Sequence, residues 1–184
     1  MKTYIVAQTE FQTQLLRRLL DTQELPEHTV LRGGKFTMAL SLGSSLLSQR
    51  SAPVAVVMDA DSVEPHKVRE HEAELEYLLP AGNFGGILAD VLMAVPQVEA
   101  VLFSDPEALE CVLGRPLTER EKIEGEFRPR AVLDRLLAEA GMDGDTFLAR
   151  INAKAAARFV EQPRIRSLVQ FVQEAASAVT AAAA

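Results

Sequence analysis

The sequence lacks the features that identify secreted and membrane proteins. Cys111 is the only cysteine among 184 residues, so no internal disulfide can form, which favours a reducing, cytoplasmic environment. No apolar run approaches the ~20 residues that a membrane-spanning helix needs. Glu10 also interrupts the first apolar run too early for a signal-peptide core. We therefore expect a cytoplasmic protein that does not enter a membrane.

Motifs for ATP hydrolysis, zinc binding and broad nucleic-acid binding are also lacking. Gly33-Gly34-Lys35 does not have the G-x-x-x-x-G-K-[ST] spacing of a phosphate-binding loop, although Lys35 is a candidate contact for a phosphate. The three histidines do not have zinc-ligand spacing. The net charge of −7 argues against a broad basic surface for nucleic acid. Any ATPase function would have to come from a partner protein.

The first part of the chain alternates between strand and helix patterns. Apolar segments at 4–7, 28–31, 53–58 and 87–95 predict four strands, and helical patterns separate them. The third segment is continuously apolar, as expected for a strand that is covered on both faces of a parallel sheet. We therefore expect residues 1–114 to form an α/β domain, with a mostly parallel, Rossmann-like four-stranded sheet flanked by helices.

After Gly114 only helix signals follow. Thr118 and Glu121 have the spacing of a capping box, and further helical patterns continue toward the end of the chain. We expect an all-helical extension over residues 115–174. The alanine-rich segment 175–184 is expected to fray.

The strongest candidate site is acidic. Asp59 ends the most apolar strand, and Asp61 lies two residues further on, where an extended chain would point both side chains the same way. Sites in open α/β sheets form beyond the carboxyl ends of strands, and Glu10 follows the first strand. Carboxylates held close together repel unless a cation lies between them, and oxygen ligands suit Mg²⁺ or Mn²⁺. These residues therefore predict a metal site.

The order of the acidic segments resembles the Toprim domain of topoisomerases, primases and nucleases of the overcoming-lysogenization-defect type. The chain has a strand, Thr9-Glu10, a helix, a strand, a helix and then an Asp-x-Asp within residues 56–62. Residues 94–105 are similar to a P-x-x-E-x-x-x-x-x-D segment of small Toprim-like proteins linked to defence nucleases. The resemblance covers residues 3–114. One departure is that Ala7-Gln8 stands where the family has Glu-Gly.

The resemblance implies a Mg²⁺-dependent nuclease or phosphoryl-transfer domain that acts on nucleic acid. Asp59, Asp61 and Glu99 would hold Mg²⁺ or Mn²⁺, and Glu10 would serve as the catalytic base or as a further ligand. The bound metal would stabilise charge on a phosphate and activate a water for phosphodiester cleavage. A partner protein that supplies ATPase function would fit the same resemblance.

Two alternatives stay open. The first is a catalytically silent Toprim-like interaction module, which Ala7 favours because the usual family glutamate is missing. The second is a phosphatase of the haloacid dehalogenase type, with Asp59 as the nucleophile, although that motif normally opens the fold. Simpler roles are also open, since Glu10 lies in a first helical turn and Asp61 can cap the next helix.

A basic stripe is the candidate surface for nucleic acid or an acidic partner. Arg150, Lys154 and Arg158 fall at i, i+4 and i+8 on a helix predicted from Asp143 or Asp145 through 159. Such a stripe can contact phosphates, or it can be an ordinary solvated helix face.

Overall fold

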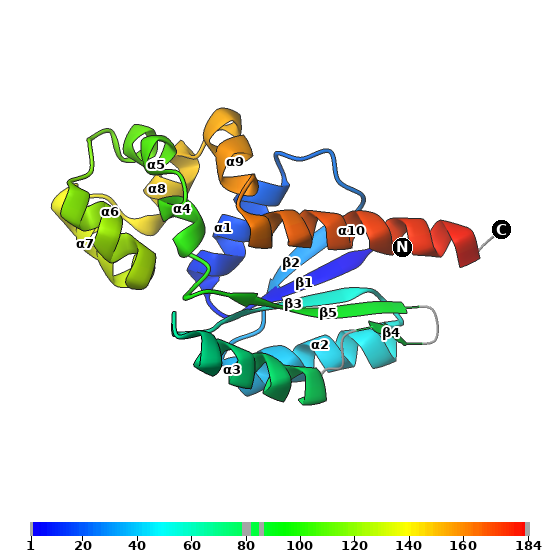
Figure 1. Ribbon diagram of the computed structural model, residues 1–184. Helices are drawn as coiled ribbons and strands as arrows, with labels where there is room; N and C mark the ends of the chain where they lie inside the picture. The colour runs from blue at the N-terminus through cyan, green and yellow to red at the C-terminus, as the bar shows by residue number, and fades with distance from the viewer. Residues whose placement is uncertain (1, 79–81, 85–86, 183–184) are drawn as a thin grey trace.

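A five-stranded sheet forms the centre of the protein, as the computed structural model shows (Figure 1). The structure describes residues 2–78, 82–84 and 87–182. The strand order is β2-β1-β3-β5-β4, in which β4 alone is antiparallel to its neighbour. The strands are β1 (Thr3–Ala7), β2 (His28–Arg32), β3 (Val54–Asp59), β4 (Gly82–Phe84) and β5 (Ile87–Ala94).

The predicted α/β fold with a mostly parallel sheet is confirmed. The four predicted strands are the parallel strands β1, β2, β3 and β5. The short strand β4 was not predicted, because its Gly-Asn-Phe sequence looks like a turn. Pro80 and Ala81, which were predicted to end the preceding helix, lie outside the described residues.

Helices cover both faces of the sheet (Figure 1). On one face lie α1 (Glu10–Leu20) and α10 (Pro163–Ala182), and on the other lie α2 (Phe36–Arg50) and α3 (Pro65–Leu78). Residues 54–58 of β3 are buried throughout, which explains their continuously apolar sequence. Among the described residues, no helix combines the length and apolar character needed to cross a membrane.

Among the described residues, six further helices gather beyond the carboxyl ends of the strands (Figure 1). Local sequence signals set several of their ends: Asp105 caps α5 with proline following it, and Thr118 and Glu121 form the predicted capping box of α6. The six are α4 (Ala100–Phe103), α5 (Pro106–Leu113), α6 (Glu119–Phe127), α7 (Pro129–Glu139), α8 (Gly144–Arg150) and α9 (Ala153–Val160).

The helical extension shares its core with the sheet. One apolar cluster joins Ile5 of β1 to Phe147 of α8, Phe159 of α9 and Leu168 of α10. The predicted boundary at residue 114 therefore does not coincide with a gap in the packing. A second cluster lies between the opposite face of the sheet and helices α2 and α3.

Two predictions for the extension differ from the structure. The single helix predicted through residue 159 is wrong, because α8 ends at Arg150 and α9 begins only at Ala153. Asn152 causes this break, since its side chain accepts a hydrogen bond from the Ala155 N–H and caps α9. The alanine-rich segment was expected to fray, but α10 includes it through Ala182, and residues 183–184 lie outside the described residues.

Candidate functional site

The side chain of Asp59 is buried at the carboxyl end of β3, and both carboxylate oxygens and the backbone N–H of this residue form hydrogen bonds. Its side chain is 4% exposed. Oδ1 accepts a hydrogen bond from the Val98 N–H at 2.9 Å, and Oδ2 accepts from Gln12 Nε2 and Arg130 Nη2, each at 2.8 Å. Its backbone N–H donates to Gln8 Oε1 at 2.8 Å. Asp59 is therefore bound by residues that follow β1 and β5, the two neighbours of β3, and by Arg130 of α7.

Glu99 shares Arg130 with Asp59. The Glu99 side chain is 2% exposed, and Arg130 donates from Nε to Oε1 at 3.0 Å and from Nη2 to Oε2 at 3.2 Å. The same Nη2 also bonds Asp59. Arg130 lies in the first turn of α7, and its guanidinium bridges two buried carboxylates that belong to the sheet and to the segment before α4. We call Asp59, Glu99 and Arg130 the acid–arginine cluster.

The charges of the cluster perturb both partners. Burial raises the pKa of Asp59, and the negative charge of Glu99 raises it further, while the bonds from Val98, Arg130 and Gln12 oppose these effects. Burial by itself would lower the pKa of Arg130, but the hydrogen bonds and charges of Glu99 and Asp59 outweigh burial and raise that pKa. Arg130 therefore stays cationic, and Asp59 takes up a proton more readily than an ordinary aspartate.

Asp61 lies at the same edge of the sheet but has a different environment. Its φ angle is 50°, which is in the left-handed region, so the expectation of an extended chain here is wrong. Its N–H donates to the Pro96 carbonyl at 2.8 Å, and its Oδ1 accepts from Gln97 Nε2 at 2.9 Å. The exposed Asp61 side chain borders a cavity of about 420 Å³, together with Arg130 and Asp134.

Glu10 is exposed in the first turn of α1. Its Oε1 accepts a hydrogen bond from Gln14 Nε2 at 3.2 Å, and among the described residues nothing bonds it to the acid–arginine cluster. The α1 side chain that does reach Asp59 is Gln12. The structure thus brings Asp59 and Glu99 together, places Asp61 nearby, and leaves Glu10 on the surface.

The geometry of the cluster fits a guanidinium better than a metal ion. Both oxygens of Asp59 and both oxygens of Glu99 already accept hydrogen bonds, and Arg130 supplies three of these bonds. A metal could bind these oxygens only after Arg130 moved away. In the part of the chain that the structure describes, no group of three or more histidine, cysteine, aspartate or glutamate side chains is arranged to hold a metal. The binding of Mg²⁺ or Mn²⁺ stays a prediction.

Asp105, the second acidic residue of segment 94–105, also binds an arginine. Asp105 caps α5 through the Ala108 N–H, and it accepts hydrogen bonds from Arg158 Nε at 2.5 Å and Nη2 at 2.6 Å. Glu107 accepts a third bond from Arg158, at 2.9 Å. Glu99 and Asp105 therefore each attach one helix of the extension, α7 and α9, to the ends of α4.

The basic residues named from the sequence lie at two separate places. Lys35 is exposed at the N-terminus of α2, and no ion pair holds it within the described residues. Arg150, Lys154 and Arg158 do not form a stripe on one helix, but all three line a cavity of about 270 Å³ between α5, α8 and α9.

Three residues of the site were not predicted. Gln12 was recognised only as part of a capping box, yet its Nε2 is free to reach Asp59 because only its Oε1 is used by the cap. Gln8 directly follows β1, and this position at a strand end could have identified it. Arg130 carries no local signal, because its partners are separated from it by 31 and 71 residues.

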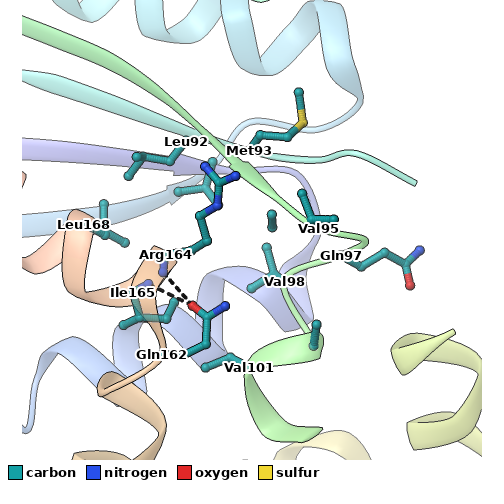
Figure 2. Close-up of a pocket in the computed structure, with 13 residues that line it drawn as sticks. Leu92, Met93, Val95, Gln97, Val98, Val101, Gln162, Arg164, Ile165 and Leu168 are labelled. Atoms are coloured by element: carbon teal, nitrogen blue, oxygen red, sulfur yellow. Dashed lines mark hydrogen bonds between the residues drawn. The ribbon is translucent and has the colours of Figure 1, made fainter. Parts of the chain in front are cut away.

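An apolar pocket lies near the carboxyl ends of β3 and β5, between these strands, α4 and the start of α10 (Figure 2). Its volume of about 20 Å³ is enough for roughly one water molecule. Gln162 accepts hydrogen bonds from the N–H groups of Arg164 and Ile165, which fixes the first turn of α10 against this pocket (Figure 2). The pocket is too small for a substrate, so it is a small gap in the packing of α10 against the sheet.

Comparisons with known proteins identify no relative of this chain. No protein-family model matches the chain. No curated protein and no solved structure is significantly similar to it. The resemblance to Toprim domains therefore depends on the residues and their order alone.

Proposed function

We propose that this protein is a Toprim-like interaction module in which Arg130 takes the place of the metal ion. One observation carries the proposal: the Arg130 guanidinium bonds both Asp59 and Glu99, the two buried carboxylates of the site. A buried pair of carboxylates needs a compensating cation, and a fixed arginine supplies one without any metal. Ala7, at the position of the usual family glutamate, supports a site that does not perform phosphoryl transfer.

The bonds of Arg130 suit a structural role. They hold the first turn of α7 against the carboxyl edge of the sheet, and α6 precedes α7 directly. On α6, Ile123 and Phe127 are 58% and 55% exposed, and Phe127 borders the cavity of about 420 Å³ beside Asp61. Large exposed apolar side chains beside a cavity are typical of a surface that contacts a partner. The partner expected from the resemblance is a protein with ATPase function, or nucleic acid.

A second candidate is the metal-dependent nuclease. The observation that favours it is that Asp61 and the acid–arginine cluster both lie at the carboxyl end of the sheet, beside an open cavity. The Arg130 side chain is 36% exposed, so it can leave the carboxylates without crossing the core. In that state Asp59, Glu99 and Asp61 would be the residues available to a metal. The phosphatase alternative is less supported, because Asp59 is buried and both of its oxygens are bonded.

Metal titration of matched variants tests the proposal. Calorimetry with Mg²⁺ and Mn²⁺ is expected to detect no binding to the wild-type protein, nor to Arg135→Met, a variant of an exposed arginine on the same helix that pairs with Glu124. Arg130→Met is expected to gain metal binding if removal of the guanidinium frees the carboxylates. That gain should disappear in Asp59→Asn/Arg130→Met.

Cleavage assays complete the test. Wild-type protein with Mg²⁺ or Mn²⁺ is expected to leave single- and double-stranded DNA and RNA intact. Metal-dependent cleavage by the wild-type protein that is abolished by Asp59→Asn would overturn the interaction-module proposal and support the nuclease.

A further inference from the structure

The second basic site is a cavity, separate from the acid–arginine cluster. Its volume is about 270 Å³, and it lies between α5, the end of α8 and the start of α9. Arg150, Lys154 and Arg158 line it together with Asn152 and Cys111. Three cations and an amide around one small cavity are a notable concentration in a chain whose net charge is −7.

Two of the three positive charges in this cavity have no counter-charge. Arg158 is neutralised by Asp105 and Glu107, which accept its hydrogen bonds. Arg150 and Lys154 are exposed, and within residues 2–78, 82–84 and 87–182 neither forms an ion pair. The three cations and the two carboxylates that bind Arg158 together carry a net charge of +1, and the positive charges of Arg150 and Lys154 are the ones available to attract an anion.

The backbone strengthens the same preference. The first N–H groups of a helix have no partner within the helix, and α9 begins at this cavity with Ala153. The amino end of a helix also carries a partial positive charge. Asn152 uses its Oδ1 to cap α9, so its Nδ2 can still donate to a ligand. Asn152 and Lys154, at the start of α9, both line the cavity.

We propose that this cavity binds the phosphate group of a nucleotide or of a phosphorylated strand end. Arg150 supplies a planar fork that suits two phosphate oxygens, and Lys154 supplies a point charge. The cavity is slightly smaller than the ~300–1,000 Å³ of drug-sized ligand sites, so it fits a phosphate with a small attached group. A free nucleotide and the terminal phosphate of a nucleic-acid strand have this chemistry in common.

Cys111 gives a direct readout of occupancy. It is the only cysteine in the chain, it is exposed, and it lines the cavity. A phosphate compound in the cavity should therefore slow alkylation of its thiol. The probes are inorganic phosphate, adenosine monophosphate, and a dinucleotide with a 5′-phosphate compared with the same dinucleotide with a 5′-hydroxyl. Buffers contain EDTA, so that metal binding at Asp59 does not contribute.

Wild-type protein is expected to show saturable protection by the phosphorylated compounds and little by the 5′-hydroxyl dinucleotide. Stronger protection by adenosine monophosphate points to free nucleotides, and stronger protection by the phosphorylated dinucleotide points to strand ends. Arg150→Gln and Lys154→Gln should each weaken protection about tenfold, since each removes a charged hydrogen-bond donor. Arg69→Gln is the control, because Arg69 is an exposed arginine on the distant helix α3.

Two results would overturn the proposal. One is alkylation of Cys111 at the same rate with and without every phosphate compound at millimolar concentration. The other is equal weakening by Arg69→Gln and by Arg150→Gln, which would indicate general charge attraction. Circular dichroism of each variant checks that it is folded. Because no metal is involved, this proposal can fail while the proposal for Arg130 stands, and the reverse.

Discussion

Replacement of Arg130 by methionine should destabilise the protein in a way that depends on pH. The change keeps most of the side-chain volume but leaves Asp59 and Glu99 buried without their cation. Removal of one partner from a buried ion pair costs about 3–5 kcal/mol. Because the Arg130 side chain is 36% exposed, solvent screens part of the interaction, and we expect about 3 kcal/mol near neutral pH. For a chain of this length that corresponds to a fall in Tm of roughly 6–12 °C.

The direction of the pH dependence follows from the pKa of Asp59. Burial and the charge of Glu99 raise this pKa in the folded protein above its ordinary value of 3.8. The folded state therefore binds a proton more tightly than the unfolded state, so this carboxyl lowers the stability as pH rises from about 3.8 through the raised value. The charge of Arg130 opposes this shift, so removal of Arg130 should raise the pKa of Asp59 further and extend the pH range over which stability falls.

The stability of Arg130→Met should thus be closest to wild type in mild acid and furthest from it near neutral pH. Urea denaturation at a series of pH values measures the difference. In Asp59→Asn/Arg130→Met the part of the pH dependence that comes from Asp59 should disappear, because position 59 can no longer ionise. Arg135→Met, which removes a mostly solvated pair, should lose less than about 1 kcal/mol at any pH. A loss below about 1 kcal/mol for Arg130→Met, equal at all pH values, would refute the reasoning.

Three further substitutions test the local structure. Arg115 hydrogen bonds lower the pKa of Glu121 to about 2, so this carboxylate stabilises the fold above its ordinary pKa of 4.5 and the contribution is lost as pH falls toward 2. Glu121→Gln should lower the free energy of unfolding by about 1 kcal/mol at neutral pH and leave it unchanged below about pH 2, as measured by urea denaturation. Gly125→Ala should lose about 1–3 kcal/mol in thermal melts, because its new Cβ would overlap the Phe103 ring. Thr9→Ala removes the capping box of α1 and should cost about 1 kcal/mol by the same measurement.

The order of strands and helices could be predicted because it is set by local patterns. The apolar run of β3 is long enough to identify a buried strand, and Asp105 with the following proline is a strong start for α5. The position of Asp59 at the sheet edge follows from the same pattern. Asn152 was also a readable signal, because an asparagine before an alanine-rich run is typical of a helix N-cap. A helix that starts there would have placed Arg150 on a different helix from Lys154 and Arg158.

The composition of the site could not be predicted in the same way. Arg130 reaches its carboxylates only because α7 packs against the carboxyl end of the sheet. The sequence near position 130 contains no pattern that predicts this packing. The left-handed backbone of Asp61 likewise comes from the bonds of its loop to Pro96 and Gln97, and no glycine marks it in the sequence. Both features depend on contacts between segments that are distant in the chain.

The acidic residues of segment 94–105 bind arginines, and these bonds compete with metal binding. Glu99 and Asp105 flank α4, and each binds an arginine from a helix of the extension: Arg130 of α7 and Arg158 of α9. The oxygens of Glu99 that would hold a metal are the ones that hold α7, so a metal ligated by Glu99 and the docked α7 exclude each other. A metal that did bind at Asp59 and Glu99 would therefore have to release the first turn of α7, and it would alter the cavity beside Asp61 that this helix lines.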